Sequence, residues 1–309
     1  MKKTLIFSIS LLVIFNLKAQ NQFNIGQYAV HQPLVNPSTI STYEDITFGL
    51  LYKEQWTGLT GAPSIQGFTF SMPIDERNKH FAGINVLNDN IGINNSTEIS
   101  GTYAYKVRTS INSRLIFGAT ASLNLVKSKL EDINTTDPND PLYSVNSPVY
   151  PLPNFKFSTY FFVKKFYLGF VMPNILENKV IEQNGSTAGY FGFDPQNLHY
   201  YLHGGYKFDL KHGNTFVPSF LIKDVAGSPI QFDLNMNFMF RHKFGVGLNL
   251  RSSKDAMIML SMYVLPELLL SYGYEYGLSE LNKFNTGTHE IVLIYRVRGK
   301  KDVIAFPRL

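Results

Sequence analysis

Apolar residues occupy every second position through much of the chain. The clearest run is 230–241, where Ile230, Phe232 and Leu234 share one side and polar residues such as Asp233 and Asn235 share the other. A period of two predicts β-strands with one apolar and one polar face. The same alternation flanks a Gly-, Asn- and Thr-containing loop in the stretch 266–296, which indicates a β-hairpin. Much of the chain repeats this unit.

About 14 segments show the alternation, and the connections between them follow a rule. Connections after odd-numbered strands are long, whereas those after even-numbered strands are mostly two to five residues. An even strand number with long loops at one end and short turns at the other is typical of an outer-membrane β-barrel. The long connections are 54–63, 88–95, 127–153, 174–197, 224–229, 252–255 and 277–287; the short ones are 75–79, 108–111, 164–165, 211–213, 241–243 and 265–266.

The apolar face is expected to meet lipid, because a Lys or Arg there costs about 2–4 kcal/mol near the midplane. Tyr272, Tyr274 and Tyr276 should therefore lie on the lipid side near the loops, as part of an aromatic girdle. The last strand should pair with the first, near 46–52, because only closure satisfies both edges in lipid. A soluble β-sandwich with one wet face is the alternative fold.

The start of the chain is typical of a secretory signal peptide. Lys2 and Lys3 precede an apolar stretch, 4–17, and the small residue Ala19, so we expect cleavage after Ala19; a retained anchor helix is the alternative. No later apolar run approaches the ~18 residues that a transmembrane helix needs. The sequence has no cysteine, 25 Phe, 18 Tyr and 17% charged residues, which suits an exported barrel without disulfides.

Four parts are expected: 1–19 signal peptide, 20–42 irregular segment at the barrel mouth or in the lumen, 43–297 barrel and 298–309 basic periplasmic tail. The expected location is the cell outer membrane, with outer-membrane lipid as a partner. Loss of residues 1–19 removes three lysines and no acidic residue, so the formal charge falls from +5 to +2. A formal net charge this close to zero does not indicate nucleic-acid binding.

Several polar residues on the predicted inner face are candidates for a lumen cluster. They could form internal salt bridges or bind a ligand, and internal packing is favoured because a moderate barrel must fill its interior. The cluster comprises Lys207, Asp209, Asp233, Asn235, Asn237, Glu275 and Arg296; Lys106 should also face the lumen. His199 and His203 share this face but lie about 13 Å apart along a strand, too far to share a metal without other ligands.

The connection 54–63 holds the only Trp and is too apolar for simple solvation. It should fold inward as a lid or contact a partner through Gln55, Trp56, Gly58 and Leu59. No nucleophile elbow of the G-x-S-x-G type occurs, so no enzyme is expected. Neither a cofactor, a metal nor a small-molecule substrate is inferred.

In several stretches the chain resembles the PorP/SprF family of type IX secretion outer-membrane proteins of Bacteroidetes. The stretches include QYAVHQPLVNPS at 27–38, YKEQWTGLTGAPSIQGFTFS at 52–71, GSPIQFDLNMNF at 227–238 and GLSELNKFNTGTHEIVLIYR at 277–296. The family's asparagine-proline-alanine pattern stands here as Asn36-Pro37-Ser38. The resemblance implies a barrel that supports secretion and surface display of cargo, such as a gliding-motility adhesin, together with other secretion components. It carries over no catalytic residue.

Two other function classes stay open. A transport barrel for hydrophobic or small solutes, plugged by 20–42, would resemble the long-chain fatty acid transporters in strand number and mobile N-terminus. An outer-membrane hydrolase would need a Ser/His pair with an orienting Asn. Liposome uptake separates the first from a secretion role, and activity on phospholipid separates the second.

Overall fold

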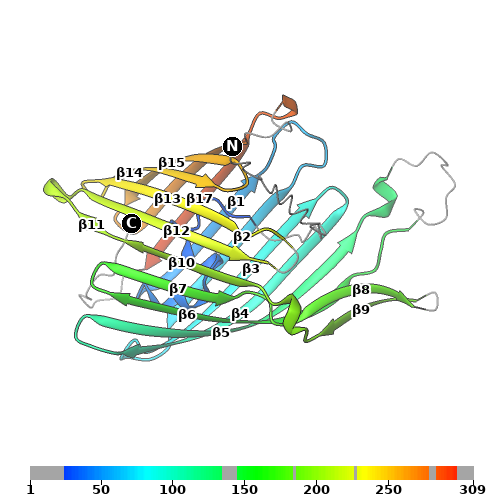
Figure 1. The fold of residues 1–309 in the computed structure, drawn as a ribbon, viewed down its shortest axis with the longest axis horizontal. Coiled ribbons are helices and arrows are strands. Elements are labelled where there is room, and N and C mark those ends of the chain that lie inside the picture. Colours follow the sequence, from blue (N-terminus) through cyan, green and yellow to red (C-terminus); the bar gives the residue numbers. More distant parts are fainter. Residues whose placement is uncertain (1–23, 134–144, 184–185, 226–227, 278–282, 298–309) are drawn as a thin grey trace, which may run out of the picture.

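The computed structural model describes residues 24–133, 145–183, 186–225, 228–277 and 283–297, which form an antiparallel β-barrel (Figure 1). The expected signal peptide and the basic tail lie outside these residues. Among the described residues no helix is long and apolar enough to cross a membrane. The strands of the barrel are β1 (Ile46–Glu54), β2 (Ser64–Pro73), β3 (His80–Ile91), β4 (Asn94–Arg108), β5 (Ser113–Ser128), β6 (Tyr150–Val163), β7 (Phe166–Met172), β10 (Tyr200–Tyr206), β11 (Phe208–Asp209), β12 (Thr215–Asp224), β13 (Gln231–Phe240), β14 (Phe244–Arg251), β15 (Asp255–Leu265), β16 (Leu268–Gly277) and β17 (Thr288–Val297).

The sheet closes on itself. β1 pairs with β17 from Ile46 opposite Val297 to Glu54 opposite His289, and the other neighbours pair in the order of the chain. β10 and β11 are separated only by Lys207 and both pair with β12, so they act as one barrel strand. The predicted closed barrel of 14 strands, and its first-to-last pairing, are confirmed. Closure leaves no open strand edge for lipid to meet.

The barrel has a turn end, where the short connections lie, and a loop end, where the longer ones lie. The predicted long loop 88–95 is wrong, because β3 and β4 continue to a two-residue turn at 92–93. Polar residues pair across this extension; Asn90 lies opposite Asn95, and the Asn88 amide donates to Thr97 Oγ1 at 2.7 Å. Where two paired strands extend beyond the lipid-facing zone, both of their faces are polar. Their sequence then lacks the alternation of apolar and polar residues, so it resembles the sequence of a loop.

The predicted loop 174–197 also contains structure. β8 (Glu177–Gln183) and β9 (Ser186–Gly192) form a separate two-stranded sheet, and in Figure 1 this hairpin extends away from the barrel. Its backbone contacts run mainly within the hairpin and toward β6. The hairpin makes one side of the barrel taller than the other.

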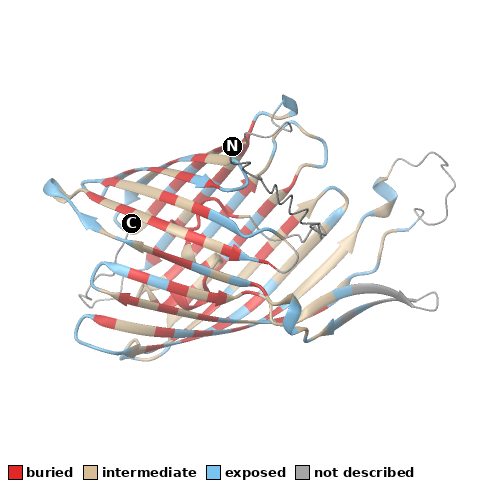
Figure 2. Cartoon of the chain, in the orientation of Figure 1, coloured by how far each residue is buried: buried red, intermediate tan, exposed pale blue. Residues whose placement is uncertain are grey.

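Burial alternates along the strands, as the period of two requires (Figure 2). Tyr272 and Tyr276 are exposed on the outer face, and Leu50 and Leu260 lie on that face too. The inner face carries buried Lys, Glu, Asp and Asn side chains, and several of these form ion pairs inside the lumen. The predicted assignment of the apolar face to the outside of the barrel is confirmed.

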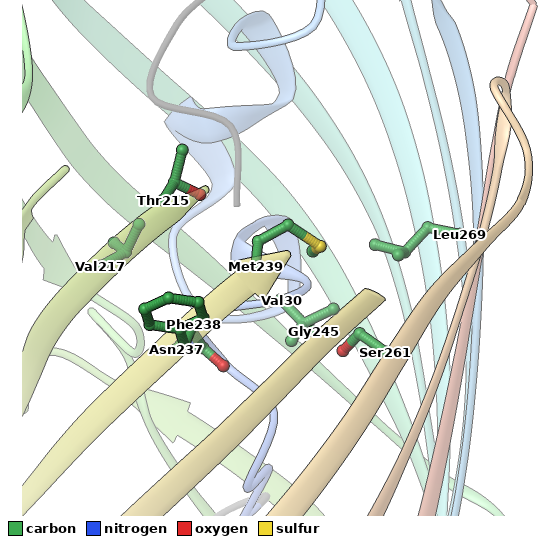
Figure 3. Close-up of a pocket in the computed structure, with 9 residues that line it drawn as sticks. All are labelled: Val30, Thr215, Val217, Asn237, Phe238, Met239, Gly245, Ser261 and Leu269. Carbon is green, nitrogen blue, oxygen red and sulfur yellow. The ribbon is translucent and has the colours of Figure 1, made fainter. Parts of the chain in front are cut away.

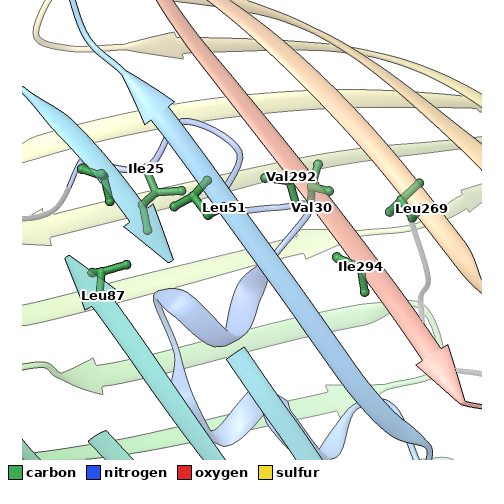
Figure 4. Packing of buried hydrophobic residues seen from close by; sticks show 8 residues of the cluster. Ile25, Val30, Leu51, Leu87, Leu269, Val292 and Ile294 are labelled. Atoms are coloured by element: carbon green, nitrogen blue, oxygen red, sulfur yellow. The ribbon is translucent and has the colours of Figure 1, made fainter. Parts of the chain in front are cut away.

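Residues 24–42 form a plug inside the lumen. They make two short 3-10 turns, η1 (Gln32–Leu34) and η2 (Pro37–Ser41), and most of their side chains are buried. Ile25 and Val30 of the plug pack with Leu51, Val292 and Ile294 of the wall (Figure 4). A second cluster joins Ile40 to aromatic side chains of β6 and β7. The plug therefore supplies the core that a barrel of this size needs.

Candidate functional site: the plugged lumen

Glu290 on β17 fixes the loop-end part of the plug. Its carboxylate accepts the backbone N–H of Gly26 at 2.9 Å and of Gln27 at 2.8 Å, and the Gln27 amide donates to the Glu290 carbonyl at 2.9 Å. Asn249 donates to the Gly26 carbonyl at 2.7 Å. One fully buried carboxylate thus holds two successive plug amides, in charge-assisted hydrogen bonds. We call this arrangement the Glu290 latch.

Lys53 joins the latch to a wider charge network. It lies opposite Glu290 in the β1–β17 register, with Nζ 3.6 Å from Glu290 Oε2 and 3.9 Å from Glu275 Oε1. The same ammonium donates to the Asn24 carbonyl at 2.6 Å. Arg251 continues the network, donating to Glu275 at 3.0 Å and lying 3.4 Å from Asp233. Buried charges of this kind must be paired, so loss of one partner leaves another uncompensated.

Asn36 fixes the middle of the plug. Its Oδ1 accepts the N–H and hydroxyl of Ser38 at 3.0 and 2.6 Å, which caps η2. Its Nδ2 donates to the Thr159 carbonyl at 3.0 Å and to His203 Nε2 at 2.8 Å. The Asn-Pro-Ser stretch, predicted as a turn, is therefore both a cap and the bridge from the plug to β6 and β10.

Small residues on the wall allow the plug to approach closely. A Cβ on Gly118 would lie 2.5 Å from Ser158 Oγ and 3.0 Å from the Cα of Ser38. A Cβ on Gly49 would lie 2.5 Å from the ring of His31, which is hydrogen-bonded to Thr69 Oγ1 at 2.9 Å. Glycine leaves the volume that these plug residues occupy.

Little free space remains between the plug and the β12–β16 wall toward the turn end. The void beneath Val30, lined also by Val217, Met239 and Leu269, has a volume of about 10 Å³ (Figure 3). That is room for no more than one water molecule. Further along, Glu44 and Lys106 form an ion pair at 2.6 Å where the plug leads into β1.

A larger cavity lies toward the loop end, between the plug and the β3–β6 wall. Its volume is about 360 Å³. Ile25, Pro33, Leu34, Val35 and Pro37 of the plug line one side, and polar residues of β3, β4 and β5 line another. Lys223 of β12 and Tyr201 of β10 also line it, together with Lys156, Pro173 and Asn174. The lumen is thus filled toward one end and hollow toward the other.

The seven residues of the predicted lumen cluster lie in different places. Asp233 and Glu275 belong to the charge network, and Asn235 and Asn237 hydrogen-bond to each other on β13. Lys207 and Asp209 lie instead at the turn end, where Asp209 is half exposed and pairs with Lys165 at 2.9 Å. Arg296 stacks its guanidinium over Tyr43 and Tyr263, 5.1 and 5.8 Å from the ring centroids.

The connection after β1 packs along the loop-end rim. The backbone N–H of Trp56 donates to Thr288 Oγ1 at 3.2 Å, and Thr57 exchanges backbone hydrogen bonds with Gly287 and Thr286 at 2.8 and 2.9 Å. The Trp56 side chain keeps 37% of its surface exposed. Gln55 and Leu59 are partly buried and Gly58 is exposed. Trp56 has φ +48° and Gly58 φ +98°, so this is a tight, specifically shaped loop.

Sequence reasoning did not single out Glu290, Lys53, Gln27 or Arg251. The three charged residues occupy inward-facing positions of their strands. Their place in the alternation of the strand could have identified them as lumen residues. What the sequence lacks is any sign that residues 24–27 are the partner. The two ends of the latch are separated by more than 260 positions in the chain.

Comparisons with known proteins agree with the fold. The TodX deltaS2S3 mutant monoaromatic hydrocarbon channel is similar with a TM-score of 0.53 at 7% identity, over 85% of this chain and 93% of that one. The CymD monoaromatic hydrocarbon channel gives 0.47 at 9% identity over 89% and 92%, and CdiB from Acinetobacter baumannii gives 0.45 at 7% identity over 82% and 60%. The likeness to the TodX mutant, at 7% identity, concerns the fold alone. No curated protein matches the chain.

The sequence itself carries more information than these distant structures. The protein-family model described as "Type IX secretion system membrane protein PorP/SprF" matches residues 17–295, which include the plug and the barrel almost to its end. The Glu290 latch, the Asn36 cap and the charge network all fall within the matched residues. The chain therefore belongs to the PorP/SprF family of type IX secretion system membrane proteins.

Proposed function

We propose that this chain is an outer-membrane component of the type IX secretion system that supports secretion or surface anchoring of cargo proteins. The family match over residues 17–295 carries this proposal. A gliding-motility adhesin is one candidate cargo, and other secretion components are the expected partners. The role is non-enzymatic: the barrel and the family both favour a membrane protein that acts through binding.

The filled lumen supports a binding role over that of an open pore. Plug residues such as Gln27, Asn36 and Ile40 are buried, and the void beneath Val30 admits no solute. Partners would then meet the rims of the barrel and not its interior. The long strands β4 and β5, and the β8–β9 hairpin that contacts β6, give the loop end surfaces for this purpose.

Co-purification from native outer membrane tests the proposal. The chain carries an affinity tag at a loop-end position, and membranes are solubilised in mild detergent and captured. We expect type IX secretion components or a large cargo protein in the eluate, at amounts absent from a matched purification of an unrelated tagged outer-membrane barrel. Recovery of the chain alone, while those components stay assembled in the same extract, would contradict it.

Transport of small solutes is the second candidate function, and the 360 Å³ cavity favours it. A transported solute would need the plug to move, because residues 24–42 are packed inside the lumen. Ion conductance of the purified chain in planar bilayers tests this reading. Transport predicts openings that increase when the Glu290 latch is weakened, whereas a silent barrel in both forms would remove it.

A further inference from the structure

One side of the turn end carries a concentration of positive charge. Three turns contribute it: the β6–β7 turn, the connection from β10 through β11 to β12, and the β13–β14 turn. The strands that they join are consecutive in the sheet, and the turns lie together at one end of the barrel in Figure 1. We call their six cationic residues the basic arc. It consists of Lys164, Lys165, Lys207, Lys211, Arg241 and Lys243.

Direct contacts join the three turns. Lys165 forms an ion pair with Asp209 at 2.9 Å, and Lys207 lies 3.9 Å from the same carboxylate. The backbone N–H of Arg241 donates to Asn214 Oδ1 at 3.0 Å, which links the second turn to the third. The basic arc is therefore one continuous surface.

Positive charge in the basic arc exceeds negative charge. Asp209 is the only acidic residue in these three turns, so the arc has a formal excess of five positive charges. Lys164, Lys211, Arg241 and Lys243 are exposed and form no ion pair among the residues that the structure describes. Like charges on one surface repel one another, and a bound anionic surface would relieve that repulsion.

An aromatic belt adjoins the basic arc on the outer face of the barrel. Each of its five rings is exposed and directly follows or precedes an arc residue in the sequence. The rings of Tyr206 and Phe208 lie 4.6 Å apart, and the Lys243 ammonium lies 5.6 Å from the centroid of the Phe244 ring. Aromatic belts of this kind lie at the depth of the lipid headgroups, so the arc should lie there too. The belt consists of Phe166, Tyr206, Phe208, Phe240 and Phe244.

The rest of the turn end does not offer a similar surface. In the β4–β5 turn, the guanidinium groups of Arg108 and Arg114 donate to carbonyls of that same turn. The β2–β3 turn, 75–79, holds two basic and two acidic residues, and Glu267 is the only charged residue of the β15–β16 turn. The excess is therefore local to the basic arc.

We infer that the basic arc binds the headgroup phosphates of anionic phospholipids in the leaflet at the turn end. Lys and Arg side chains form charge-assisted hydrogen bonds to phosphate oxygens. Their long stems let them reach the headgroups while the neighbouring rings stay in the interfacial zone. An acidic protein would approach the rim from the water, and the aromatic belt beside the cations favours lipid instead. This lipid site goes beyond the proposed secretion role and does not depend on it.

A local fluorescence measurement tests the site, because the chain has a single Trp and it lies at the loop end. Trp56→Phe removes that fluorophore, and Phe244→Trp places one beside Lys243. Ile74→Trp in the same background gives a control reporter, since Ile74 is exposed next to the balanced β2–β3 turn. Each chain is reconstituted in phosphatidylcholine vesicles that contain brominated phosphatidylglycerol or brominated phosphatidylcholine at equal mole fraction. The ratio of the two quenching constants measures the local preference for the anionic lipid.

The preference should be high only in the basic arc. Each Lys or Arg near an anionic membrane surface strengthens attraction roughly 5-fold. With one or two cations near each headgroup, we expect a preference of roughly 5- to 25-fold at position 244, and about 1 at position 74, in ~0.1 M salt.

Matched charge variants assign the effect to the arc. Arg241→Gln with Lys243→Gln should lower the preference at position 244 to roughly 1- to 2-fold, whereas Arg241→Lys with Lys243→Arg keeps both charges and should retain it. Arg77→Gln with Lys79→Gln removes the same charge from the rim outside the arc and should change nothing at position 244.

Heat-modifiable migration in gels verifies that each variant is folded. Equal quenching by the two lipids at position 244 would overturn the inference and would leave an acidic protein surface as the partner of the arc. A preference that survives Arg241→Gln with Lys243→Gln would also overturn it, as would an equal preference at position 74.

Discussion

Replacing Glu290 by Gln should release the loop-end part of the plug while the barrel stays closed. The substitution preserves side-chain size but exchanges one carboxylate oxygen for an NH₂ group. That group cannot accept a hydrogen bond, so the N–H of either Gly26 or Gln27 loses its acceptor, at present 2.9 or 2.8 Å away. Lys53 also loses a charged neighbour 3.6 Å from its ammonium. The β1–β17 backbone pairing is unaffected.

The expected size of the effect follows from the lost contact. A hydrogen bond to a charged group contributes about 1.5–3 kcal/mol, and an unpaired buried N–H costs a similar amount if it stays buried. The freed plug can instead reach water, so we take about 1.5–3 kcal/mol as the change in the opening free energy. That corresponds to a roughly 10- to 150-fold rise in the population of the open form.

Hydrogen exchange at the amides of Gly26 and Gln27 measures this population. Their exchange should accelerate by the same roughly 10- to 150-fold in Glu290→Gln, while the amides of β1 and β17 keep their protection. Glu44→Gln is the matched control, because Glu44 pairs with Lys106 where the plug leads into β1. Unchanged exchange at both plug amides in a folded Glu290→Gln barrel would refute the latch.

Three further substitutions test other parts of the molecule. Leu260→Arg on the outer face of β15 should destabilise the barrel by about 2–4 kcal/mol in urea unfolding from lipid vesicles, and an effect under 0.5 kcal/mol would place this face outside the lipid. Asn36→Ala removes four hydrogen bonds of a buried side chain, so limited proteolysis should cut residues 24–42 faster; equal rates would remove its role as an anchor. Gly118→Val places a Cβ 3.0 Å from the Cα of Ser38, so the plug should shift and bilayer conductance should rise, and a silent variant would show that the plug adapts.

The barrel itself could be predicted because the features that indicate it are local in the sequence. Alternation along a strand reports which face meets lipid, and the lengths of the connections report the two ends. The faces of Tyr272 and Asp233, and the pairing of β1 with β17, follow from those two signals. The prediction was wrong where the alternation of apolar and polar residues stops although the strand continues. The Asn-rich end of the β3–β4 hairpin is a paired strand without an apolar face, so it reads as a loop.

The site could be predicted only in part, because it depends on contacts that are distant in sequence. Residues 24–42 have no period, and their place in the lumen follows from hydrogen bonds to Glu290, Thr159 and His203. Arg296 and Asp233 both occupy inward-facing positions of their strands, so the alternation alone places them in one group. The structure separates them, since strand position along the barrel axis decides which inward residues meet.

Comparison of the surface proteome in cells with and without this chain tests the central claim most directly. The gene is deleted in its native host and restored on a plasmid, and surface proteins are labelled and quantified by mass spectrometry. The account predicts that one or more proteins exported by the type IX system disappear from the surface on deletion and return on complementation, while other surface proteins keep their level. An unchanged surface level of every such protein would contradict it.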